Sequence, residues 1–117
     1  MRRLASITLI AVLAWFVEAA ALGDYFRVTY TIDRSGPREI RLIGRIFNTT
    51  SRDAVNVQLR VQALDAAGNV LTEPPAFVDR LVQARSEGYW EASLGPDPRI
   101  SGFRVVVVGY KFRIQGP

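Results

Sequence analysis

The sequence contains no histidine and no cysteine, and this limits the chemistry it can perform. Histidine is the usual general base near neutral pH, and both residue types are common metal ligands and partners in covalent catalysis. Five serines follow the N-terminal segment without an imidazole to activate them, and the single lysine, Lys111, has no serine at a motif spacing. The composition therefore predicts that the protein is not an enzyme and has no catalytic residue.

The carboxylates are scattered, and each lies beside an expected turn or on the polar side of an alternating segment. Such positions favour solubility and turn capping. Asp65 with Gly68 and Asn69 faintly resembles a calcium loop, but Ala66 and Ala67 stand where such a loop needs oxygen ligands. We therefore expect no metal site and no cofactor.

The net charge is +4, and fourteen of the fifteen basic residues are arginine. Arginine binds carboxylates and phosphates through two parallel hydrogen bonds, so an anionic partner is conceivable. The basic residues form no run, which argues against a nucleic-acid partner. The aromatic residues could line an apolar groove, but core filling is the better expectation in a small domain, so no small-molecule substrate is predicted.

The N-terminus has the three parts of a secretory signal. Met1-Arg2-Arg3 is positively charged, the residues from Leu4 to Val17 are almost wholly apolar, and small residues follow. We expect residues 1–23 to be a signal peptide, cleaved before Leu22 or Asp24, and residues 24–117 to form one periplasmic or secreted domain. The alternative is an uncleaved membrane anchor over residues 4–22, with the domain on the periplasmic side, because this stretch is close to the ~20 residues that span a bilayer.

Alternating apolar and polar residues dominate the rest of the chain. From Val55 to Ala63 every second residue is apolar, and Tyr25–Asp33 and Tyr89–Leu94 alternate in the same way. In an extended chain this gives each strand one apolar face that is buried and one polar face that contacts solvent. Turn residues separate about seven such segments at spacings of roughly 8–12 residues, which is typical of a sandwich. The prediction is an all-β, immunoglobulin-like antiparallel β-sandwich.

Particular residues refine this prediction. Val57, Leu59, Val61, Trp90 and Val106 are expected to be buried. Pro74-Pro75 must lie at a sheet edge or where the chain switches sheets, since neither residue can donate to a ladder. Residues 76–82 are ambiguous between a strand and a helical turn, Gly109 is expected at a bulge or bend, and Gly68 at a hairpin loop. Asn48-Thr49-Thr50 matches a glycosylation acceptor, but a turn-capping role is expected for its asparagine.

Residues 42–91 resemble the FxLYD-type domains, which are small immunoglobulin-like sandwiches in exported and membrane-anchored bacterial proteins. The matching features are Gly44-Arg45-Ile46-Phe47-Asn48, the polar turn that follows it, and Asp65-Ala66-Ala67-Gly68-Asn69-Val70. The motif F-x-L-Y-D, which gives the family its name, aligns with residues 61–65, where both of its aromatic residues are absent. The resemblance implies an immunoglobulin-like sandwich in an exported or membrane-anchored protein, and it bears on the fold more than on function.

We therefore expect a non-enzymatic module of the bacterial envelope that binds a protein partner or a second copy of itself. The alternative is an accessory subunit of a membrane complex, held by the uncleaved N-terminal helix. The first strand contains no proline and carries a mixed aromatic, cationic and hydroxyl surface, of the kind enriched at contact sites. The candidate partner-binding residues on it are Tyr25, Arg27, Thr29 and Thr31.

Overall fold

The computed structural model describes residues 18–19 and 25–114, with backbone only at 18–19. These residues form nine strands: β1 (Glu18–Ala19), β2 (Phe26–Asp33), β3 (Ile40–Asn48), β4 (Ala54–Leu64), β5 (Val70–Thr72), β6 (Ala76–Val78), β7 (Leu81–Val82), β8 (Glu87–Leu94) and β9 (Gly102–Phe112). The expected signal or anchor segment, apart from β1, lies outside the described residues.

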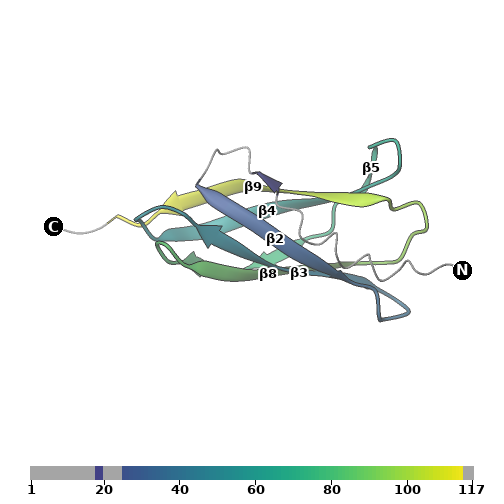
Figure 1. The fold of residues 1–117 in the computed structure, drawn as a ribbon, viewed down its shortest axis with the longest axis horizontal. Helices are drawn as coiled ribbons and strands as arrows, with labels where there is room; N and C mark the ends of the chain where they lie inside the picture. Colours follow the sequence, from purple (N-terminus) through teal and green to yellow (C-terminus); the bar gives the residue numbers. More distant parts are fainter. Residues whose placement is uncertain (1–17, 20–24, 115–117) are drawn as a thin grey trace, which may run out of the picture.

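The strands form two antiparallel sheets that pack face to face (Figure 1). One sheet has the order β1-β2-β3-β8-β6. In the other, β9 pairs along β4, while β5 and β7 pair with opposite ends of β4. The orders β2-β3-β8-β6 and β5-β4-β9 correspond to the A-B-E-D and C′-C-F arrangements of immunoglobulin-type sandwiches. The all-β, immunoglobulin-like prediction is thus confirmed at the level of topology.

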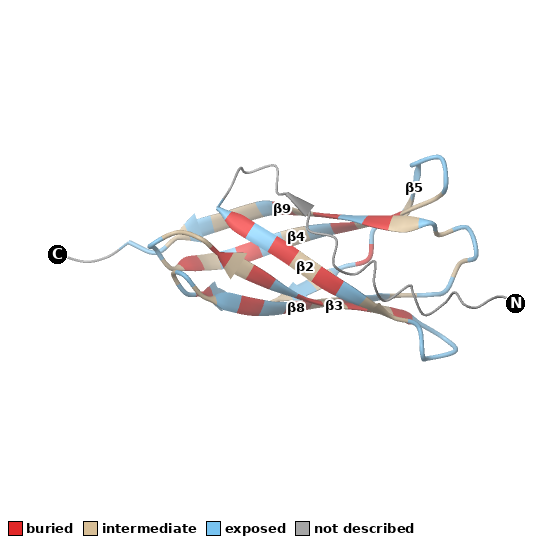
Figure 2. Ribbon diagram, in the orientation of Figure 1, coloured by how far each residue is buried: buried red, intermediate tan, exposed pale blue. Residues whose placement is uncertain are grey.

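The alternation predicted from the sequence is visible along β2 and β3, where buried and accessible residues follow one another (Figure 2). Val57, Val61 and Trp90 are buried as expected, whereas Leu59 is half-buried at the margin of the core. The prediction for Val106 is wrong. Because Val105 and Val107 pair with Val61 and Leu59, these two valines face the core, and Val106 turns to the other side of the sheet.

A bulge in β4 changes which residues at its start are buried. Asn56 has a φ of 55°, in the left-handed region that asparagine tolerates better than most residues. The register between β4 and β9 shifts on either side of Gln58. Gln58 pairs with Gly109, so the bulge or bend expected at Gly109 is confirmed. As a result Ala54 is buried and Val55 is only half-buried, although uninterrupted alternation predicted Val55 on the buried face.

The segment from Val70 to Val82 crosses between the sheets. β5 belongs to one sheet and β6 to the other, so the chain switches sheets at Pro74-Pro75, which is one of the two predicted alternatives. Residues 76–82 form β6 and β7, which lie in different sheets, and not one strand or a helical turn. This division, together with β1, gives nine strands where about seven were expected.

Trp90 has the largest fully buried side chain among the described residues, and it connects three strands of one sheet. Its indole N–H donates to the carbonyl oxygen of Thr29 over 3.2 Å, and its ring meets Tyr30 edge-on with the centroids 6.0 Å apart. Gly44 lies opposite Trp90 on β3. A side chain at Gly44 would overlap the Thr29 carbonyl and approach the indole nitrogen to 2.5 Å, so glycine is what allows β2 and Trp90 to come together.

Candidate functional site: a sheet face and a groove

Three of the four predicted partner-binding residues lie together. Arg27, Thr29 and Thr31 alternate along β2 on the outer face of its sheet, and Arg27 and Thr31 are exposed. Tyr25 precedes the strand and packs edge-on against Tyr110 and Phe112 of β9, with ring centroids 6.2 and 5.7 Å away. The structure therefore separates Tyr25 from the surface to which the sequence assigned it.

The outer face of this sheet is larger and more aromatic than β2 alone indicated. Register places β3 between β2 and β8, so that Thr29, Arg45 and Tyr89 form one cross-strand row. Sequence alternation located these residues on polar faces, but only the strand order brings them together. We call this surface the arginine–aromatic face; it consists of Arg27, Thr29, Thr31, Arg41, Ile43, Arg45, Phe47, Phe77, Glu87, Tyr89 and Glu91.

Cation–π contacts and ion pairs order the side chains of the arginine–aromatic face. The Arg27 guanidinium lies 5.7 Å from the centre of the Phe47 ring, and that of Arg45 lies 5.6 Å from the Tyr89 ring. Arg45 also pairs with Glu87 over 3.4 Å. Stacked arginine and exposed aromatic groups give a contact surface that loses little side-chain freedom on binding.

Glu91 is the centre of a second cluster on this face. The Tyr89 hydroxyl donates to Glu91 Oε1 over 2.6 Å, and Arg41 Nη2 donates to the same oxygen over 2.9 Å. The bond from Tyr89, and then that from Arg41, lowers the pKa of Glu91 below its ordinary value. The same bond raises the pKa of Tyr89, because losing the phenolic proton would place two negative charges together.

The protein is expected to lose stability in acid and to be insensitive to pH near neutrality. Hydrogen bonds lower the pKa values of Asp33, Asp65, Glu91 and Asp97 in the folded state, so their contribution is complete above the ordinary values of about 4 and is lost as the pH falls through the lowered ones. With no histidine, little titrates between about pH 5 and 8. Melting temperature against pH should be flat there and fall below about pH 4.5. In the Glu91→Gln variant the melting temperature should fall less steeply with pH below about 4.5. An unchanged slope would contradict the role given to Glu91 in acid stability.

Asn48 belongs to the fold and not to a binding surface. Its side chain is fully buried, and Nδ2 donates to the carbonyls of Arg52 and Val82 over 2.7 and 3.0 Å. Its Oδ1 accepts from the backbone N–H and the hydroxyl of Thr50 over 2.9 and 2.7 Å. The predicted turn-capping role is confirmed, and the buried amide is not accessible for glycosylation in the folded protein.

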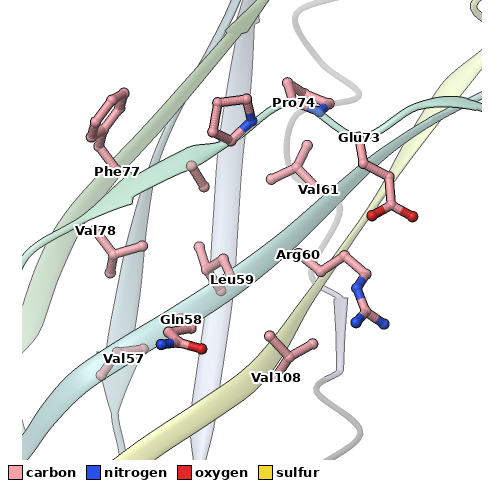
Figure 3. A pocket seen from close by; sticks show the side chains of 12 residues that line it. Val57, Gln58, Leu59, Arg60, Val61, Glu73, Pro74, Phe77, Val78 and Val108 are labelled. Atoms are coloured by element: carbon pink, nitrogen blue, oxygen red, sulfur yellow. The ribbon is translucent and has the colours of Figure 1, made fainter.

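A groove opens where the two sheets part, between β4 and the segment from Glu73 to Val78 (Figure 3). It has a volume of about 540 Å³, and an adjoining hollow of about 460 Å³ shares Val57, Gln58 and Val78 with it. Leu59 and Val61 rise from β4 on the side of the segment from Glu73 to Val78, whereas Arg60 projects on the opposite side of the strand and Phe77 points outwards at the rim (Figure 3). We call the two hollows together the β4–β6 groove. Alternation did not predict it, because it depends on where β5 and β7 end.

The described residues contain no group of three or more acidic side chains placed to hold a metal ion. Within the same residues, no helix is long and apolar enough to cross a membrane.

Comparison with solved structures finds a likeness of fold. No protein-family profile matches the sequence, so the resemblance to FxLYD-type domains gains no support, and no curated protein matches it. Among solved structures, the chain is similar to the GAE domain of yeast GGA1, with a TM-score of 0.48 and 14% identity, over 86% of this chain and 98% of that one. A likeness at this level carries no information about function.

Proposed function

We propose that this protein is a non-enzymatic interaction module that binds a protein partner through the arginine–aromatic face. The observation that carries the proposal is the arrangement of that face. Exposed and half-buried aromatic rings and arginines occupy adjacent positions on four paired strands, and ring contacts hold Arg27 and Arg45 in place. Tyrosine and arginine are enriched among the residues that contribute most to protein interfaces.

The charge balance of the face favours a folded partner with both signs of charge. Arg27, Arg41 and Arg45 are matched by Glu87 and Glu91 within the face, with Asp33 beside them. A surface of this kind selects a partner by complementary pairing more than by bulk attraction. A second copy of this chain also carries both positive and negative charges, so the experiment must distinguish self-association from binding to a different protein.

The proposed location is the bacterial envelope, supported by the three-part signal pattern of residues 1–23. Cleavage before Leu22 or Asp24 would remove β1, which pairs with Arg27 and Val28, and would open that end of β2. The alternative, an accessory subunit held by residues 4–22, keeps β1. Intact mass of the protein recovered from membrane and soluble fractions distinguishes the two.

The decisive experiment compares the partners of the wild type with those of the double variant Arg27→Glu, Tyr89→Ala. Tagged protein is cross-linked in the source cells and purified, and the captured proteins are quantified by mass spectrometry. We expect a specific set to fall at least about tenfold, since substitutions at interface centres cost roughly 2 kcal/mol or more. Sedimentation of the purified protein over a range of concentrations separately tests a second copy as the partner.

The matched control is Arg104→Glu, Val70→Ala, which reverses one exposed arginine and shortens one exposed apolar side chain on the other sheet. Its captured set should equal that of the wild type. An identical set and identical sedimentation for the wild type and a well-folded Arg27→Glu, Tyr89→Ala protein would exclude the arginine–aromatic face as the binding surface.

A further inference from the structure

The middle of β4 has a free backbone edge within the described part of the chain. β9 pairs along one edge of β4, whereas β7 pairs with Ala54 and Val55, and β5 with Ala63 and Leu64, at the ends of the other edge. Between these two short strands, residues 57–62 have no strand partner on that side. Because alternate residues of a strand direct N–H and C=O to the same edge, about three residues present backbone groups there.

The β4–β6 groove lies along this free edge. The half-buried side chains of Leu59 and Val78 line its walls, together with the buried Val57 and Val61. An extended segment placed in the groove would meet main-chain hydrogen-bonding groups on β4 and apolar side chains from both sheets. This is the combination used when a peptide adds a strand to a sheet.

The cations around the groove indicate the charge of the occupant. Arg80 and Lys111 line the adjoining hollow, and Arg60 borders the larger one from the other side of β4. Within residues 25–114, none of these three forms an ion pair, although Arg41, Arg45, Arg99 and Arg113 each pair with a carboxylate. The one carboxylate at the groove, Glu73, lies at its far end and accepts a hydrogen bond from Gln62 over 2.8 Å.

We infer that the β4–β6 groove binds an extended acidic peptide segment, which pairs with the free edge of β4 between Val57 and Gln62. Apolar residues of the peptide pack against Leu59 and Val78, and its carboxylates lie near Arg80 and Lys111. The site shares only Phe77, at its rim, with the arginine–aromatic face, so either assignment can fail while the other stands.

The test uses the chain from Leu22 or from Asp24 onward, as the expected cleavage would leave it, and also the full chain. The probe is a fluorescein-labelled peptide of eight alternating valines and aspartates. Fluorescence anisotropy at low ionic strength should report binding of this peptide and at least tenfold weaker binding of a valine–lysine counterpart. N-methylation of alternate peptide nitrogens, on the face that pairs with β4, should also weaken binding at least tenfold. Amide NMR shifts should change at residues 57–62 and not on β2.

Charge-reversal variants locate the site. Arg80→Glu, Lys111→Glu should weaken binding of the aspartate peptide at least tenfold. The matched control Arg34→Glu, Arg38→Glu changes the net charge equally in the exposed β2–β3 turn and should weaken it less than twofold. Equal effects of the two variants, equal binding of the lysine peptide, or no binding of the aspartate peptide at millimolar concentration would overturn the inference. Retained binding of Arg27→Glu, Tyr89→Ala supports independence from the arginine–aromatic face.

Discussion

Replacing Gly44 by alanine is expected to destabilise the protein by about 3–5 kcal/mol and to lower its unfolding midpoint in urea. The new Cβ would overlap the carbonyl oxygen of Thr29 and come within 2.5 Å of the Trp90 indole nitrogen, and neither is the free end of a flexible side chain. Either β2 must leave β3 or Trp90 must leave the core. Losing a buried tryptophan costs about 3–5 kcal/mol, a large part of the roughly 5–15 kcal/mol that stabilises a domain. Urea denaturation followed by tryptophan fluorescence measures the loss.

The matched control for this prediction is Gly95→Ala, because no atom lies within 4 Å of the position that its Cβ would take. This variant should remain within about 0.5 kcal/mol of the wild type. If Gly44→Ala unfolded at the same urea concentration as Gly95→Ala, the close approach of β2, β3 and Trp90 described above would be contradicted.

The sequence predicted best where a local pattern determines the outcome. β2, β3 and β8 alternate, and a strand has only two faces, so the inward set followed directly. The same holds for the loop at Gly68, where a φ of 87° and the bonds from Ala67 and Asn69 to Asp65 form a local turn. Pro74-Pro75 indicated a sheet edge or a switch between sheets, because proline lacks the donor that a ladder needs, and the structure has the switch.

The failed predictions concern features that depend on contacts distant in sequence. The run Val105–Val108 has no alternation, so only its register with β4 decides that Val105 and Val107 face inwards. The bulge at Asn56 is stabilised by a hydrogen bond from its N–H to the carbonyl of Arg80, and no local signal separates Val55 from the later apolar residues. Tyr25 is two residues before Arg27, so alternation placed it on the same face. It precedes β2, however, and its ring packs against Tyr110 and Phe112 of β9.

The candidate sites show the same division. Alternation identified Arg27, Thr29 and Thr31 as outward, but Tyr89 joins them only because β3 lies between β2 and β8. The groove exists because β5 and β7 pair with β4 only at its two ends. The sequence did not predict it, because the hydrophobic pattern does not determine how long a strand at a sheet edge will be.

Replacing Asn48 by alanine is expected to cost about 3 kcal/mol or more, since each buried group left without a partner costs roughly 1–3 kcal/mol. The amide joins the end of β3 to the carbonyls of Arg52 and Val82 and accepts two bonds from Thr50, so its loss leaves groups unpaired at several points. The free energy of unfolding in urea measures the effect. Asn69→Ala is the control, because Asn69 is exposed and its side chain makes one long bond of 3.4 Å.

Asn48→Asp tests the same site through its pH dependence. The carboxylate keeps the oxygen that accepts from Thr50 but faces the carbonyl oxygens of Arg52 and Val82, with no solvent to stabilise its charge. Burial raises the folded pKa of such a group above its unfolded value of about 3.9, so the charged form destabilises the fold increasingly as the pH rises above that value. The difference in unfolding free energy between Asn48→Asp and the wild type should therefore be larger at pH 7 than at pH 4. A difference that does not change with pH would mean that the side chain at position 48 reaches water, contrary to its complete burial.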